Sequence, residues 1–216
     1  PLRKIQVYAS IILEKYNSEI PEVVNANILR MQASAAKMQK LIEALVSYAS
    51  LMYEDAKFEP VDLNTVIKEV VADLQEEIED KKVTIDISTL PTVNGINFQL
   101  QQLFVNIISN SIKFAKKDVP LLIKISSSLT TDSIGTIYEA QSKQWFKITV
   151  VDNGIGFNDS YKYDIFKVFQ RLHTNQYNGS GIGLAICKKI VESHNGYITA
   201  VGELNKGAHF DIYLPV

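Results

Sequence analysis

The stretch from Gln99 to Leu184 organises this chain, because four short polar or glycine-rich segments interrupt its apolar runs. In order, they read NIISNSIKF (residues 106–114), VDNGIGF (151–157), IFKVFQRLH (165–173) and GSGIGL (179–184). The apolar runs between them can form a core but carry no reactive groups. We therefore take the four segments as the candidates for the chemistry of this region.

The first segment lies on a predicted helix over residues 98–115, along which apolar side chains recur at helical spacing. Asn106, Asn110 and Lys113 fall on another face, where spacings of four and three residues stack them on adjacent turns. An amide oxygen is a hard ligand acceptable to Mg²⁺, which takes much of its shell from water and phosphates. Two amides and an ammonium group suit a metal-bound polyphosphate. A solvated helix face has the same pattern and is the alternative interpretation.

The second segment follows an alternating run that predicts a strand ending at Asp152. Gly154 and Gly156 permit backbone angles closed to other residues and the close approach of a flat ring. A buried carboxylate can accept a hydrogen bond from an exocyclic amine. This combination suits adenine, although a hairpin turn that begins Asp-Asn-Gly reads the same way.

The third segment places Phe166 and Phe169 three residues apart and then the cation Arg171 and His173, as an amphipathic turn also would. The fourth segment runs into a helical pattern, and glycines that open a helix expose N–H groups to an anion. It is therefore a candidate phosphate loop. It is not a P-loop, because the chain has no Gly-Lys pair, and its glycine spacing differs from the dinucleotide-binding fingerprint.

Together, the four segments resemble the N, G1, F and G2 boxes of the histidine kinase ATP-binding domain. The matching patterns are Asn-x-x-x-Asn-x-x-Lys-Phe at 106–114, Asp-x-Gly-x-Gly at 152–156, Phe-x-x-Phe at 166–169 and Gly-x-Gly-x-Gly-Leu at 179–184. The resemblance covers nearly the whole chain. It implies a sensor histidine kinase of a two-component system, with ATP and Mg²⁺ as cofactors and a GHKL (Bergerat) ATP-binding fold.

The resemblance also implies a role for each matching residue. Asn110 would bind Mg²⁺, Asn106 and Lys113 would meet the phosphates, and Asp152 would accept from the adenine amine. The other implied ATP-binding residues are Phe114, Gly154, Ile155 and Gly156 near the base, Phe166, Arg171 and His173 in a lid, and Gly179, Ser180, Gly181, Ile182, Gly183 and Leu184 in the phosphate loop.

The composition predicts a folded chain without a charge bias. The 216 residues are 46% hydrophobic, and 22 basic side chains balance 24 acidic ones, so we expect no nucleic-acid partner. No apolar run approaches the roughly 20 residues of a membrane span, so no membrane contact is expected. The one cysteine, Cys187, excludes an internal disulfide, fits a reducing cytoplasm and is expected to pack in a helix.

Residues 1–57 predict a helical hairpin that serves as a dimerisation domain. Apolar residues step by three and four through residues 2–16 and again through 28–52, which is a heptad pattern. One hairpin buries only one side of its seam, so we expect a homodimer with a four-helix bundle; packing on the rest of the same chain is the alternative. Pro60 ends the pattern, and residues 58–216 are taken as the ATP-binding domain.

The second domain is predicted to be α+β, a two-layer α/β sandwich with helices on one face of a mixed sheet. The expected elements are helices at 63–78 and 98–115, strands at 83–87, 121–128 and 144–151, and a final hairpin of 198–201 and 210–214. The polar span from Phe157 to Gly179 is predicted to be a lid. The segment Val93-Asn94-Gly95 lacks the acidic residue that relatives often carry there, so the cap of the following helix is left open.

The phosphoacceptor of such kinases is a histidine in a motif that resembles His-Asp/Glu-x-x-x-Pro-Leu, and only Pro1-Leu2 match its end. The acceptor is therefore expected before residue 1, while His194 and His209 are expected to be structural. This fragment should bind ATP without phosphorylating itself. The resemblance further implies a response-regulator receiver domain as partner, docked on the hairpin.

Two other functions are compatible with this nucleotide fold. GHKL-type ATPases carry a water-activating glutamate four residues before the metal-binding Asn, but here that position is Asn106, whose amide cannot act as a general base. A non-catalytic ATP-binding or dimerisation module is the other alternative. The four intact segments argue against it.

Overall fold

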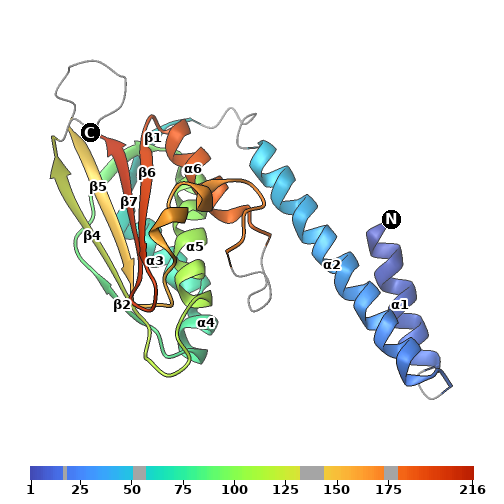
Figure 1. Cartoon of the computed structure of the whole chain (residues 1–216). Helices are drawn as coiled ribbons and strands as arrows, with labels where there is room; N and C mark the ends of the chain where they lie inside the picture. Colours follow the sequence, from blue (N-terminus) through green and yellow to red (C-terminus); the bar gives the residue numbers. More distant parts are fainter. Residues whose placement is uncertain (17–18, 51–56, 132–143, 173–179) are drawn as a thin grey trace. The chain divides into compact units, whose positions relative to one another are not determined.

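The computed structural model describes the chain apart from residues 17–18, 51–56, 132–143 and 173–179 (Figure 1). The chain divides into two compact units, Pro1–Ser50 and Leu51–Val216. The division falls after Ser50, whereas the sequence pattern placed the domain boundary between residues 57 and 58.

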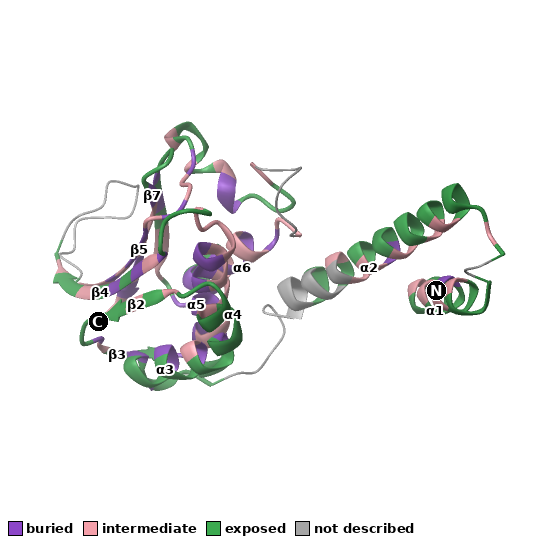
Figure 2. Ribbon diagram, turned by 90° about the horizontal axis from the view of Figure 1, so that it is seen from below, coloured by how far each residue is buried: buried purple, intermediate pink, exposed green. Residues whose placement is uncertain are grey.

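The first unit consists of the two helices α1 (Leu2–Tyr16) and α2 (Glu22–Ser50). They approach each other at small residues, because Ala9 and Ala35 are buried and Gln32 Nε2 donates to Ser10 Oγ at 2.9 Å. Most described residues of the two helices are exposed or intermediate in burial (Figure 2). The exposed apolar side chains include Ile5, Val7, Tyr8, Val23, Leu29, Met31, Met38, Ile42 and Leu45.

The second unit is built on a five-stranded mixed sheet with the strand order β2-β4-β5-β7-β6. Its strands are β2 (Thr84–Ile87), β4 (Leu122–Thr130), β5 (Trp145–Asp152), β6 (Tyr197–Glu203) and β7 (Gly207–Pro215). β2 pairs with β4 in parallel, and the other neighbours are antiparallel. The mixed sheet predicted from the alternating apolar runs is confirmed.

The helices of this unit lie on one face of the sheet (Figure 1). They are α3 (Leu63–Asp73), α4 (Gln75–Asp80), α5 (Asn97–Lys113) and α6 (Gly183–Ser193). Phe104 and Ile107 of α5, Ile148 of β5 and Ile190 of α6 are fully buried, which places the core between the helices and the sheet. The predicted two-layer α/β sandwich is therefore confirmed. Cys187 is buried in α6, and burial raises the pKa of its thiol, so it packs as a small apolar side chain.

Two features of the second unit differ from the sequence prediction. The single helix expected at 63–78 is broken at Leu74, whose backbone leaves helical angles (φ −101°, ψ 14°) while the apolar spacing continues across it. A two-stranded antiparallel sheet of β1 (Glu59–Asp62) and β3 (Thr92–Gly95) was not predicted. Both strands have four residues, too few for an alternating pattern to stand out.

Candidate functional site

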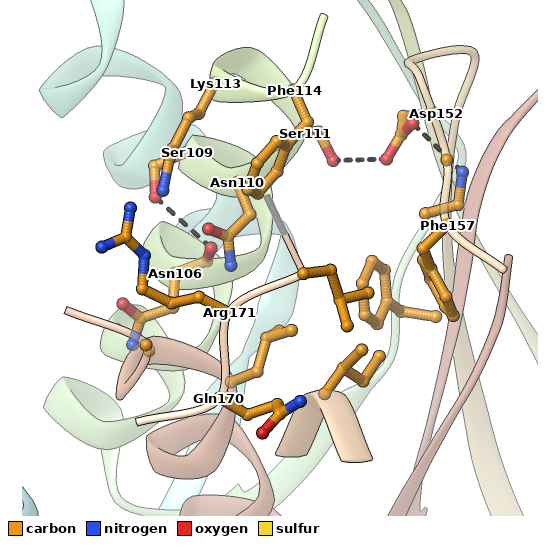
Figure 3. Close-up of a pocket in the computed structure, with 18 of the residues that line it drawn as sticks. Asn106, Ser109, Asn110, Ser111, Lys113, Phe114, Asp152, Phe157, Gln170 and Arg171 are labelled. Atoms are coloured by element: carbon orange, nitrogen blue, oxygen red, sulfur yellow. Dashed lines mark hydrogen bonds between the residues drawn. The ribbon is translucent and has the colours of Figure 1, made fainter. Parts of the chain in front are cut away.

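A cavity of about 330 Å³ opens between α5, the turn after β5, the segment around Arg171 and the start of α6 (Figure 3). All four of the polar or glycine-rich segments contribute to its lining. The sequence-predicted site residues that line it are Asn106, Asn110, Lys113, Phe114, Asp152, Gly156, Arg171, Ser180, Gly181, Gly183 and Leu184. Residues as far apart in the chain as Asn106 and Phe210 thus meet at one site.

Four other predicted residues do not line the cavity. The backbone N–H of Ile155 donates to the Phe114 carbonyl at 2.9 Å, and a Cβ on Gly154 would lie 2.7 Å from that same oxygen. These two residues thus dock the turn after β5 against the end of α5. Phe166 and Ile182 are buried in the core instead. The remaining two predictions, His173 and Gly179, lie outside the described residues.

One end of the cavity is cationic. Lys113 extends from the last turn of α5 and Arg171 approaches from the opposite segment (Figure 3). Burial, and then the nearby Arg171 guanidinium, lower the pKa of the Lys113 ammonium group. Two cations crowded at a partly buried site favour an anionic ligand, which would relieve their repulsion.

The amide of Asn106 also favours a ligand with hydrogen-bond acceptors, because its Nδ2 is buried without a hydrogen-bond partner among the described residues. A buried N–H donor left unpaired costs about 1–3 kcal/mol, so a ligand acceptor at this point would stabilise the site. A Cβ on Gly183 would lie 3.3 Å from the Asn106 side-chain oxygen, so the start of α6 approaches this amide closely. Glycine at position 183 preserves that approach.

The other end of the cavity is formed by the carboxylate of Asp152, which is only 8% exposed. Its Oδ1 accepts from the backbone N–H groups of Gly154 at 2.9 Å and Ala208 at 3.2 Å. Its Oδ2 accepts from the Ser111 hydroxyl at 2.9 Å. The carboxylate is thus held in a fixed orientation from three different elements.

The two ends lie apart, with Asn110 nearer the cationic end (Figure 3). Apolar side chains also line the cavity. The apolar wall consists of Phe157, Ile165, Leu172 and Phe210. The cavity therefore fits a flat ring that carries an amine and an anionic tail. The acceptor carboxylate would meet the amine, the apolar side chains would contact the ring, and the two cations would meet the anion.

Several lining residues were missed from the sequence. Ser111 falls beside the apolar stripe of α5 and was overlooked in favour of its neighbours Asn110 and Lys113. Ala208 and Phe210 come from β7, which carries no motif that could signal them. The other missed residues are Ser109, Phe157, Ile165, Gln170 and Leu172.

The described residues hold no cluster of three or more His, Cys, Asp or Glu side chains that could bind a metal ion. Among the same residues, no helix has the length and apolar character needed to cross a membrane.

The sequence of residues 95–216 matches the family described as histidine kinase-, DNA gyrase B-, and HSP90-like ATPase. Over its whole length the chain is 32% identical to cyanobacterial phytochrome A of Nostoc sp., of which it covers 27%. The chain spans about a quarter of the length of this relative and of two other curated phytochrome relatives.

Solved structures share the fold. Full-length ShkA in complex with AMPPNP superimposes with a TM-score of 0.66 at 22% identity, covering 100% of this chain and 43% of ShkA. Histidine kinase ThkA in complex with response regulator protein TrrA gives a TM-score of 0.65 at 19% identity, covering 99% of this chain and 58% of ThkA. The family match spans the region that holds the cavity, and so the chain belongs to the histidine kinase-, DNA gyrase B-, and HSP90-like ATPase family.

Proposed function

We propose that this chain is the kinase core of a two-component sensor histidine kinase, which transfers the γ-phosphoryl group of Mg-ATP to a histidine outside this sequence and thence to a response-regulator aspartate. The observation that carries the proposal is the cavity, with a buried acceptor carboxylate at one end and two cations at the other. ATP carries the complementary groups in the same order.

At the base end, we assign Asp152 to accept a hydrogen bond from the 6-amino group of adenine. Its carboxylate is an acceptor at every lone pair, and three donors from the protein fix its direction. The apolar wall, which includes Phe157 and Phe210, would cover the faces of the ring. Gly154 and Gly156 keep the turn beside it compact.

At the phosphate end, we assign Lys113 and Arg171 to the phosphate oxygens and the unpaired Asn106 amide to an additional hydrogen bond. Asn110 offers the amide oxygen that would hold Mg²⁺, whose charge would neutralise the triphosphate when bound. Ser180 and Gly181, next to the start of α6, would place backbone N–H groups near the same anion. The role of these residues in phosphoryl transfer is to position and stabilise charge.

The residue types favour a kinase over an ATPase. The position four residues before Asn110 is Asn106, and an amide cannot remove a proton from an attacking water. The nucleophile must then come from a separate group. A histidine presented by another segment fits this requirement.

Neither described histidine is presented as that acceptor. His194 is buried with both ring nitrogens hydrogen-bonded to backbone groups, and His209 Nε2 lies 2.8 Å from Asp211 Oδ1 on the sheet. We propose that the acceptor is the histidine of the motif that resembles His-Asp/Glu-x-x-x-Pro-Leu, of which Pro1-Leu2 would be the end. The fragment alone should bind ATP without phosphorylating itself.

We further propose that the helices of the first unit form a homodimeric four-helix bundle and dock the response-regulator receiver domain. The exposed apolar side chains on α1 and α2 support the pairing, because burying them against a second copy would remove them from water. A cytoplasmic location is part of the same proposal, and the single cysteine agrees with a reducing compartment.

Isothermal titration calorimetry of the 216-residue chain with ATP, with and without Mg²⁺, tests the function directly. We expect binding that is strengthened by Mg²⁺, and an Asn110→Ala variant that loses the strengthening while it keeps weak metal-free binding. Absence of any binding to Mg-ATP would falsify the proposal. Equal Mg-ATP affinity in the variant would instead favour a non-catalytic module.

A phosphorylation assay separates kinase from ATPase. The chain is mixed with labelled ATP and a second polypeptide that carries the upstream histidine. We expect label on that histidine and none on the 216-residue chain. Steady release of inorganic phosphate without labelled protein would point to the ATPase alternative.

A further inference from the structure

We propose that Ser111 is a specificity-determining residue of the nucleotide site, which selects a purine with a 6-amino group by orienting the Asp152 carboxylate. The inference rests on the proposed function, in which Asp152 receives the base. It concerns how the site distinguishes adenine from other bases.

The contact between the two residues is short and shielded. Ser111 Oγ lies 2.9 Å from Asp152 Oδ2, and the two side chains are 2% and 8% exposed (Figure 3). Ser111 also lies 3.3 Å from the carbonyl oxygen of Ile107, one turn earlier in α5. A hydroxyl has one proton to donate, and the shorter contact to a carboxylate is the stronger hydrogen bond. The Ser111 proton is therefore directed to Asp152.

The direction of the Ser111–Asp152 hydrogen bond determines which donors and acceptors the two side chains offer to a base. With its proton committed to Asp152, the Ser111 oxygen offers only lone pairs, and the carboxylate is an acceptor throughout. Asp152 Oδ1 is already occupied by two backbone N–H groups, so Oδ2 retains the acceptor capacity. A 6-amino group would donate to this edge, whereas a 6-oxo group would meet acceptors without a donor.

The surrounding backbone prevents the pair from rearranging to suit another base. The Ile155 N–H donates to the Phe114 carbonyl at 2.9 Å and binds the turn after Asp152 to the end of α5. Ala208, on β7, holds the other carboxylate oxygen. A carboxylate held at both oxygens cannot rotate, so the Ser111 hydroxyl helps to fix the direction in which Oδ2 accepts a hydrogen bond.

Calorimetry with two ligands tests this role. Mg-ATP and the Mg-triphosphate of purine riboside, which lacks only the 6-amino group, are titrated into the wild-type chain and into Ser111→Ala. We expect the substitution to weaken ATP binding about tenfold, as for a misoriented hydrogen bond to a charged group, and to leave the analogue within about twofold. The preference of the wild type for ATP over GTP should also shrink.

Ser109→Ala is the matched control. Ser109 is a second serine of α5 that lines the cavity, but its hydroxyl donates to the Asn106 carbonyl at 3.3 Å and not to Asp152. Its removal should leave the ratio of the ATP and analogue affinities at the wild-type value. Ser111→Cys keeps the size of the side chain with a weaker donor, and should lower the same ratio even where the alanine variant folds poorly.

The outcomes separate the two proposals. Wild-type binding to ATP together with equal losses for ATP and analogue in Ser111→Ala would show that Ser111 only supports the fold, and would overturn the inference alone. An unchanged ATP affinity in that variant would overturn it as well. A wild type that binds neither ligand would contradict the proposed function and the inference together.

Discussion

The imidazole of His194, at the end of α6, caps the start of α5, because its Nε2 accepts the hydrogen bond of the Ile96 backbone N–H at 3.0 Å. Its Nδ1 donates to the Ile190 carbonyl at 2.7 Å, and the side chain is 1% exposed. Ile96 is the N-cap residue of α5, and its apolar side chain accepts no hydrogen bond from the first turn of the helix. A residue 98 positions later thus joins the two helices that border the cavity.

This contact predicts a pH dependence of stability. Burial lowers the pKa of His194 below its ordinary 6.5, since the charged imidazolium would lose its solvation and Nε2 could no longer accept from Ile96. The unfolded chain then binds a proton at higher pH than the folded one. The stabilisation is therefore complete above about pH 6.5 and is lost as pH falls through the lowered pKa.

Urea unfolding between neutral pH and about pH 5 measures the effect. We expect the wild type to lose stability over this range, and His194→Gln to be less stable at neutral pH by about 1–3 kcal/mol and to lose part of the pH dependence. His209→Gln is the control and should keep it. If the pH dependence of the unfolding free energy were lost in His209→Gln and kept in His194→Gln, the assignment to His194 would be wrong.

Gly207→Ala should destabilise the second unit by about 3 kcal/mol or more. Gly207 has φ of +127°, a region that strains other residues, and a Cβ there would collide with the carbonyl oxygen of Asp152. Gly183→Ala is the comparison, because a Cβ at this helical position would lie 3.3 Å from Asn106 Oδ1, a tight contact that a small shift of the Asn106 side chain can relieve. Gly183→Ala should leave the thermal unfolding midpoint nearly unchanged but weaken ATP binding. Equal midpoints for the two variants would contradict the prediction.

Lys113→Gln should weaken Mg-ATP binding by about 10- to 100-fold and make the remaining affinity less sensitive to salt. The lowered pKa of Lys113 shows that its charge is disfavoured by burial and by Arg171, so its removal should not reduce the unfolding free energy. Lys117→Gln removes an exposed charge just beyond α5 and should bind ATP as the wild type does. Calorimetric titrations with Mg-ATP at two salt concentrations test this prediction. A similar loss of affinity in Lys113→Gln and Lys117→Gln would indicate a general charge effect.

The exposed apolar side chains of α2 predict a concentration-dependent dimer. Met31→Glu combined with Met38→Glu should shift the chain to monomer in sedimentation velocity, since charges would have to be buried in the interface. Mg-ATP affinity should persist, because the cavity lies within the second unit. Lys37→Glu, an exposed charge change on the same helix, should remain dimeric. A wild type that sediments as a monomer at all concentrations would refute the pairing.

Local patterns in the sequence were enough for much of the architecture. The 3.6-residue apolar spacing of α5 and the two-residue alternation of β5 and β7 each reflect which face of an element is buried, and that information lies within one element. The polar and glycine-rich segments likewise marked most of the cavity. These features depend on neighbours in the chain, so the sequence by itself determined them.

What the sequence left open involves partners far apart in the chain. Ser111 meets Asp152 across 41 residues, Ala208 reaches the same carboxylate across 56, and His194 caps α5 across 98. No local periodicity marks such pairs. They exist because β7 is inserted between β5 and β6 and because α6 packs against α5. Only the tertiary structure decided which hydroxyl, which backbone N–H and which imidazole would satisfy the polar groups buried at these points.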